Sequence, residues 1–165
     1  MDLRETQAPL KEQYRTEPAA ASLTLSATAS SEDANPVACS VDIGRAIYAA
    51  QAHAGVGGEG TAACSGDMLL AALAACAQLT CQMVASSSGI PLRSVKVTVE
   101  GDLDLRGTLG LSRSAPVGFS AIRAHFDIDA PDADERQLRS LQRSTEAYCV
   151  VMQTLTHPPT IETRW

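Results

Sequence analysis

The feature that most constrains this chain is the segment 65–88, which is apolar on nearly every side when it is placed on a helix. Ser65 is its predicted N-cap, and Asp67 would place a negative charge in the first turn, where the helix dipole favours it. The segment then continues without Pro or Gly until Gly89, a residue type that commonly ends helices. Because a helix without a polar face must be covered by other elements, we expect this one at the buried centre of the fold.

Alternating apolar and polar residues predict strands on both sides of this helix. The predicted strands are residues 22–29, 37–43, 46–52, 95–105, 117–128 and 160–165. The apolar phase slips between Phe119 and Ile122, as a β-bulge would make it. An amphipathic helix over 132–148, with Tyr148 on its apolar face, and a short helix after it complete the order β-β-β-α-β-β-α-α-β. This order predicts an α+β fold of antiparallel sheet packed with helices.

Length and charge limit the possible classes of function. At 165 residues the chain fits one domain, which we expect over residues 21–165, with an N-terminal arm over residues 1–20. Its 19 acidic against 13 basic residues, without a basic cluster, argue against nucleic-acid binding. The chain starts with charged residues rather than a signal sequence, and Gln78, Thr80 and Gln82 make the central helix a poor membrane span.

Five cysteines at irregular spacing do not form the disulfide framework of a secreted protein, so we expect a cytoplasmic location. Cys39 lies on the apolar face of its strand and is predicted to be core. Cys81 follows Cys76 by five positions, roughly 140° around the helix, so these two cannot easily bridge. Cys64 precedes the helix N-terminus, where the pKa of its thiol could fall. It is still roughly 13–14 Å from Cys76, and a disulfide needs Cα atoms within about 7 Å.

Cys149 is the best-placed distant partner for Cys76. It lies where one predicted helix ends and a short apolar one begins, and the N-terminus of the second helix could stabilise a thiolate. Cysteine is nevertheless among the most buried residue types, and packing alone explains many buried thiols. The residues therefore leave two interpretations open, a redox pair and simple filling of the core.

Two motifs bear on this choice. The run Gly-Asp-Met-Leu-Leu-Ala-Ala-Leu-Ala-Ala-Cys at residues 66–76 resembles the signature helix of the OsmC/Ohr family, the osmotically inducible and organic hydroperoxide resistance proteins. Tyr-Cys-Val-Val-Met-Gln-Thr-Leu at residues 148–155 resembles the second motif of that family. The resemblance covers residues 20–165. It implies an OsmC-like fold, with antiparallel sheets around a buried central helix, and an intertwined homodimer with a two-cysteine site near the subunit interface.

The resemblance also implies a chemistry. Cys76 would be the peroxidatic thiolate, which attacks an organic hydroperoxide and becomes a sulfenic acid. Cys149 would be the resolving thiol, which condenses with the sulfenic acid to a disulfide. An external dithiol of the dihydrolipoamide type would then reduce the disulfide, so that no bound cofactor is expected. The function implied is a peroxidase in defence against oxidative and osmotic stress.

This chain departs from the family pattern around the reactive cysteine. Peroxidases of the family stabilise the thiolate with an arginine from an N-terminal loop, held by a glutamate ten residues before the cysteine. Here that position is Gly66. The adjacent Asp67 could replace the glutamate or could simply be a first-turn acid that favours the helix. Arg15 and Arg45 are the candidate arginines, and His53, beside a glycine-rich loop, is a further candidate neighbour of the site.

Two further interpretations follow from these departures. One is an OsmC-like protein that binds a small apolar or lipid-like molecule and has little peroxidase activity, which Gly66 favours. The other is a structural dimer with inert cysteines. The histidines are scattered, and no Cys or His spacing resembles a zinc site, so no metal is expected.

Overall fold

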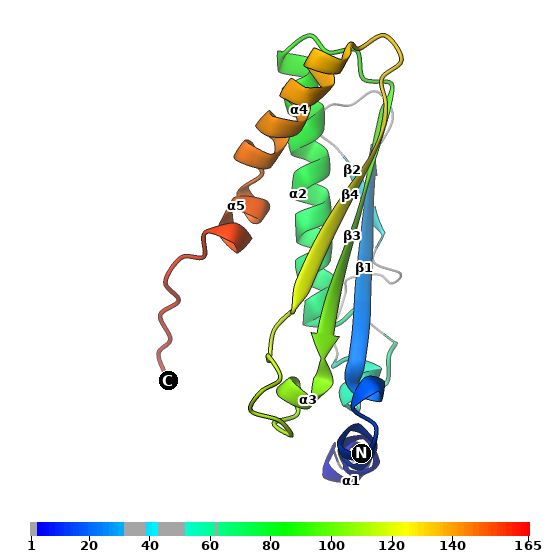
Figure 1. Cartoon of the computed structure of the whole chain (residues 1–165), viewed down its shortest axis with the longest axis vertical. Helices are drawn as coiled ribbons and strands as arrows, with labels where there is room; N and C mark the ends of the chain where they lie inside the picture. The colour runs from blue at the N-terminus through cyan, green and yellow to red at the C-terminus, as the bar shows by residue number, and fades with distance from the viewer. Residues whose placement is uncertain (1–2, 32–38, 43–51, 62) are drawn as a thin grey trace. The chain divides into compact units, whose positions relative to one another are not determined.

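The computed structural model describes residues 3–31, 39–42, 52–61 and 63–165 (Figure 1). Its elements are α1 (Leu3–Thr16), the 3-10 helix η1 (Pro18–Ala21), β1 (Ser22–Ser31), β2 (Cys39–Asp42), the 3-10 helix η2 (Ala54–Val56), α2 (Ser65–Ser87), β3 (Ser94–Asp104), α3 (Leu105–Thr108), β4 (Ala121–Asp129), α4 (Glu135–Tyr148) and α5 (Val150–Thr156). The described strands form a four-stranded sheet in the order β2-β1-β3-β4. Of the predicted strand over residues 46–52, only Ala52 is described, and it has no regular structure; residues 46–51 lie outside the described residues.

The chain divides into two compact units. Unit 1 consists of Met1–Thr28, Asp42–Ala71 and Thr98–His125, and unit 2 of Ala29–Val41, Ala72–Val97 and Phe126–Trp165. Both units take their residues from helices and from strands of the sheet. The predicted mixture of helices and sheet is therefore confirmed.

Side-chain contacts in unit 1 establish how β1 and β3 run relative to each other. Thr24 Oγ1 donates to Asp102 Oδ1 at 2.8 Å, and Thr28 pairs with Thr98, so β1 and β3 are antiparallel. On β3, valines 95, 97 and 99 are buried while the residues between them face outward, which confirms the predicted alternation.

The predicted strand over 117–128 is shorter than expected. The structure begins β4 at Ala121, so the slip in apolar phase marks the start of the strand and not a bulge within it. Phe119 lies before the strand, where its ring covers Gly101 of β3. A Cβ atom built on this glycine would meet two ring carbons at 2.6 Å. The absence of a side chain at Gly101 therefore lets the aromatic ring pack directly on the strand.

The central helix α2 confirms the expected position and length, with one change at its start. The amide of Met68 donates to the carbonyl of Cys64 at 3.1 Å, so Cys64 is the N-cap and Ser65 the first helical residue. At the other end Gly89 has φ +64, and the amide of Ile90 donates to the carbonyl of Ala85 at 2.9 Å. This six-residue closure is a Schellman motif, and it explains the glycine.

By length and composition α2 could cross a membrane. However, 56% of its apolar window is buried inside the structure, and a buried core helix passes the same test. We therefore treat α2 as the core helix of the fold.

The expected N-terminal arm contains regular structure. Residues 3–16 form α1, and Tyr14 on this helix is only 4% exposed. Its hydroxyl donates to the carbonyl of Gly55 at 2.7 Å, and its ring packs with Ala21 and Leu105. The segment thus contributes to the core of unit 1, while the domain boundary after residue 20 stays a prediction.

In unit 2, α4 begins with a full capping box, in which Asp134 and Gln137 each bind the backbone of the other. The helix buries Leu141 and Thr145, but Tyr148 is 68% exposed and does not share their face as predicted. The expected final strand is not formed either. Residues 158–165 have no regular structure and are exposed, and the sheet formed by the described strands does not include them.

Candidate functional site

Cys76 and Cys149 come together in unit 2. Cys76 lies in the middle of α2 and is partly exposed, whereas Cys149 lies between α4 and α5 and is completely buried. Cys149 lies close enough to Cys76 for the neighbouring sulfur to raise the pKa of its thiol, and both cysteines are free thiols. The structure therefore places near each other the two cysteines that the sequence motifs single out.

The surroundings of Cys149 keep its proton in place. Burial, as the largest cause, and the neighbouring sulfur of Cys76 together raise the pKa of this thiol to about 11. The backbone amides of Met152 and Val151 act in the opposite direction but are outweighed. The N-terminus of α5 therefore favours a Cys149 thiolate as predicted, but desolvation has the larger effect and the pKa is raised on balance.

A break between two helices positions Cys149. The residue is the C-cap of α4 and the N-cap of α5, with φ −70 and ψ 104. Its amide donates to the carbonyl of Thr145 at 3.0 Å, and its carbonyl accepts from the amide of Gln153 at 2.8 Å. Cys149 thus continues the hydrogen-bond pattern of both helices while its own backbone is extended.

Cys81 is a buried neighbour of α4. Burial raises the pKa of its thiol, and the hydroxyl of Thr145 lowers it by a smaller amount. This hydroxyl oxygen is buried without a full hydrogen bond, so its interaction with the sulfur is weak. A buried, protonated thiol is a poor nucleophile, and Cys81 therefore serves as packing between α2 and α4.

Cys64 is also buried. Burial raises the pKa of its thiol, and the backbone hydrogen bond at Asp67 only partly offsets this, so the predicted fall is wrong. Cys39 begins β2, and its side chain lies outside the described residues. Its assignment to the core stays a prediction.

The predicted supporting residues are engaged in local contacts within unit 1. The carboxylate of Asp67 accepts the amide of Cys64 at 2.8 Å, which is the bond that an acid at the third helical position makes to an N-cap. Arg15 pairs with Glu12 on the exposed side of α1. His53 accepts the amide of Gly55 through Nδ1 at 2.9 Å and thereby caps η2. The remaining candidate, the arginine at position 45, lies outside the described residues.

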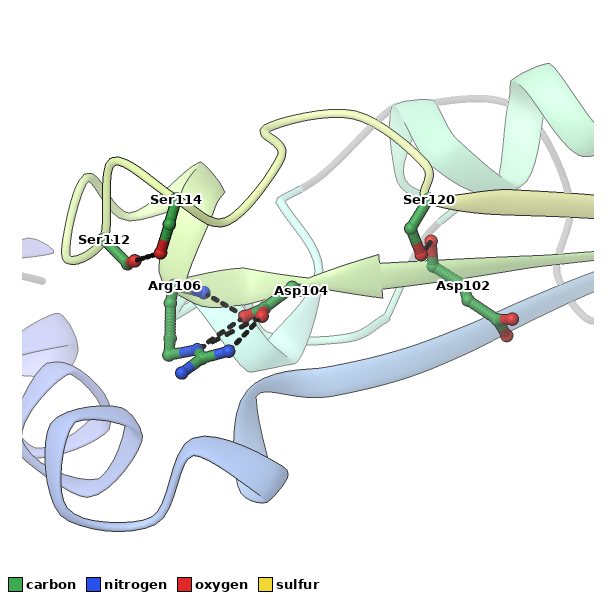
Figure 2. Close-up of polar contacts among 6 residues, drawn as sticks. All are labelled: Asp102, Asp104, Arg106, Ser112, Ser114 and Ser120. Carbon is green, nitrogen blue, oxygen red and sulfur yellow. Dashed lines mark hydrogen bonds and ion pairs between the residues drawn. The ribbon is translucent and has the colours of Figure 1, made fainter.

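A separate polar cluster closes the end of β3 in unit 1 (Figure 2). Arg106 is the second residue of α3. Its backbone amide and its guanidinium both donate hydrogen bonds to the carboxylate of Asp104. These bonds hold the pKa of Asp104 below its usual value. Ser120 binds the carbonyl of Asp102 beside them. Asp104 is thus the N-cap of α3, and its charge is paired with that of Arg106.

Sequence reasoning missed two residues around Cys149, namely Thr145 as its backbone partner and Gln153 as a link across the helix break. The signal for Gln153 was its place four residues after Cys149, the spacing of one helical turn. Among the residues that the structure describes, no three His, Cys, Asp or Glu side chains gather closely enough to hold a metal ion.

Comparison with known proteins identifies the fold. A crystal structure of an OsmC-like hydroperoxide resistance protein from Jannaschia sp. CCS1 superimposes with a TM-score of 0.61. The match covers 88% of this chain and 93% of that one, at 13% sequence identity. No curated protein matches the chain. The family model for OsmC-like proteins matches residues 58–164, and the chain therefore belongs to the OsmC-like protein family.

Proposed function

We propose that this protein is a thiol-dependent peroxidase that reduces organic hydroperoxides in defence against oxidative and osmotic stress. The observation that carries the proposal is the closeness of Cys149, between α4 and α5, to Cys76 of α2, whose sulfur raises the pKa of the Cys149 thiol. The likeness in fold to a protein described as a hydroperoxide resistance protein supports the same class of chemistry.

The two neighbouring thiols, Cys76 and Cys149, can complete a cycle that reduces a hydroperoxide. The thiolate of Cys76 attacks the distal oxygen of the hydroperoxide, the O–O bond breaks, and the alkoxide leaves and takes up a proton. The resulting sulfenic acid of Cys76 condenses with the thiol of Cys149, which releases water and forms the S–S bond. An external dithiol, of the dihydrolipoamide type, then reduces the disulfide and is itself oxidised to a disulfide.

The different environments of the two sulfurs support their separate roles. Cys76 is partly exposed and can meet a substrate, whereas Cys149 is buried and keeps its proton because its pKa is about 11. In the condensation the sulfur of Cys149 is the nucleophile, and its proton leaves with the hydroxyl of the sulfenic acid as water. We therefore assign attack on the peroxide to Cys76 and resolution to Cys149.

The surroundings of Cys76 favour an organic substrate over hydrogen peroxide. Leu79 and Met83 follow Cys76 by three and seven positions and so share its face of α2. Met83 is 48% exposed, and Val150, next to the resolving cysteine, is 70% exposed. Apolar side chains at this surface would bind the alkyl part of an organic hydroperoxide, which hydrogen peroxide lacks.

We further propose that the protein works as a cytoplasmic, intertwined homodimer. The C-terminal segment 158–165 leaves Ile161 and Trp165 exposed at 85% and 111%. This segment was predicted to be a strand, and a sheet edge of a second copy would give it the pairing that it lacks in one chain. Light scattering coupled to size exclusion, with a chain truncated after residue 157 as comparison, tests the proposal. A monomeric full-length protein would contradict it.

The peroxidase proposal is tested by mapping disulfides. The reduced protein is mixed with one equivalent of cumene hydroperoxide or hydrogen peroxide, quenched by alkylation and analysed by peptide mass spectrometry. We expect rapid, stoichiometric bridging of Cys76 and Cys149, faster with cumene hydroperoxide. Cys81→Ser, which changes the buried cysteine of α2, is the matched control and should bridge normally. If both thiols remain free in the parent protein, the proposal is wrong.

A second candidate function is binding of a small apolar or lipid-like molecule with little peroxidase activity. It is favoured by Gly66 at the position where the family's peroxidases have a glutamate, and by the use of the Asp67 carboxylate to cap α2. Slow bridging at high peroxide, together with unchanged ligand binding by Cys76→Ser, would support this function. Binding is measured with a fluorescent fatty acid as the probe.

A further inference from the structure

The joint between α4 and α5 leaves the resolving cysteine on a single extended residue. α4 ends at Tyr148 and α5 begins at Val150, so Cys149 alone separates the two helices. Rotation about one backbone bond at this residue would change the angle between the helices and the direction of the thiol. Some further contact must therefore fix the joint if the sulfur is to stay beside Cys76.

The side chain of Gln153 makes such a contact. Its Nε2 donates to the backbone carbonyl of Glu146 at 2.8 Å. In an uninterrupted helix this carbonyl would accept from the amide four residues later, that of Val150. The break directs Val150 into a new helix, and the side-chain amide of Gln153 supplies a donor in its place. One side chain of α5 thus ties its helix to the last turn of α4.

We propose that Gln153 is a positioning residue, which holds the thiol of Cys149 against Cys76 by bracing the α4–α5 joint. This inference rests on the proposed function, because it concerns the same disulfide-forming pair. A disulfide forms only when the Cα atoms approach within about 7 Å and the sulfurs are correctly oriented. Bracing raises the fraction of time that the buried thiol spends in that geometry, and so raises its effective concentration at Cys76.

The chain offers a matched control for this residue. Gln142 Nε2 donates to Glu146 Oε1 at 2.9 Å. Gln142 is therefore the same type of residue and binds the same partner, but its bond stays within α4 and does not cross the break. Replacing each glutamine with leucine removes its side-chain amide. Comparing the two variants separates the loss of the bond across the helix break from a general weakening of α4.

The test measures the Cys76–Cys149 disulfide in glutathione redox buffers. In this equilibrium the reduced protein reacts with oxidised glutathione to give the protein disulfide and two molecules of reduced glutathione. We expect Gln153→Leu to lower the equilibrium constant roughly five-fold, as loss of one hydrogen bond implies. Gln142→Leu should match the parent. Gln153→Lys, which restores a long donor, should recover part of the loss. Melting temperatures of the reduced variants check that each one is folded.

A kinetic measurement separates positioning from reactivity. With cumene hydroperoxide, Gln153→Leu should form the Cys76 sulfenic acid, trapped with dimedone, at the rate of the parent and should condense it more slowly. Equilibrium constants that are equal in Gln153→Leu and parent, or lowered equally by both leucine variants, would overturn the inference. If the parent bridges in glutathione but not with peroxide, the peroxidase proposal is wrong, while the glutathione constants still decide the role of Gln153.

Discussion

Arg123 on β4 donates to both carboxylate oxygens of Asp102 on β3, and Nη2 lies 2.9 Å from Oδ1. Thr24 of β1 donates to the same carboxylate at 2.8 Å. The hydrogen bonds from Arg123 and then from Thr24 lower the pKa of Asp102 from 3.8 to about 2. Because Asp102 lies on an exposed face of the sheet, hydrogen bonding and not burial determines this shift.

The depressed pKa of Asp102 predicts a loss of stability in acid. The carboxylate is easier to ionise in the folded chain, so its contribution is complete above the unfolded pKa of about 4 and is lost as the pH falls through about 2. Urea unfolding at a series of pH values should show this decline in the parent and less of it in Asp102→Asn. Arg93→Gln breaks an exposed pair with Asp129 and is the control. Superimposable curves for Asp102→Asn and parent would contradict the prediction.

Cys76 and Cys149 should differ in their rates of alkylation. We expect iodoacetamide at pH 8 to modify Cys76 before Cys149 in the folded, reduced protein, because Cys149 is buried and its pKa is about 11. Cys76→Ala should lower the pKa of Cys149, since the contact and charge of Cys76 raise it. Mass spectrometry over a range of pH measures both effects. The buried Cys81 should react only after unfolding, and equal rates for Cys76 and Cys149 would refute the assignment.

Asp67 should affect the free energy of unfolding more than the rate of disulfide formation. Asp67→Ala removes the carboxylate that caps the amide of Cys64, and loss of such a cap costs about 1 kcal/mol in free energy of unfolding. Asp134→Ala, at the capping box of α4, gives a comparison of the same kind. Urea unfolding measures the loss. Unchanged stability of Asp67→Ala together with slower disulfide formation would instead mean that this carboxylate acts on the reactive cysteine.

Gly107 should tolerate no side chain. A Cβ atom there would lie 2.1 Å from the backbone carbonyl oxygen of Pro116, which cannot move away like a flexible side chain. We expect Gly107→Ala to reduce the free energy of unfolding by about 1–3 kcal/mol. Gly118→Ala is the control, because nothing lies within 4 Å of the added atom. Equal melting temperatures for the two variants would show that the loop adapts freely.

The sequence predicted best those elements whose pattern depends on local rules. Residues 65–87 form the expected helix because their apolar surface, their first-turn acid and Gly89 agree with one another. The alternation along β3 was equally clear, since each outward residue is polar and each inward one apolar or glycine. The pairing of Cys76 with Cys149 came from family resemblance and stays a prediction, which the influence of Cys76 on the pKa of Cys149 supports.

What the sequence did not predict depends on packing between distant segments. The segment containing Tyr14 was expected to be an arm, but its ring fills a core with Leu105, almost a hundred residues away. The pKa of Cys149 was expected to fall at a helix N-terminus, but burial by other elements has the larger effect. The bond from Gln153 to Glu146 depends on a helix break whose angle no local pattern specifies.

The position of Cys149, far along the chain from Cys76, has a consequence for the unfolded protein. The disulfide that we propose would close a loop of roughly 70 residues and restrict the conformations open to the unfolded chain. For a loop of this length the lost chain entropy corresponds to about 4 kcal/mol in favour of the oxidised fold. In a protein of this size that is a rise in melting temperature on the order of 10 °C. Each turnover would thus pass through a form that is harder to unfold than the resting, reduced one.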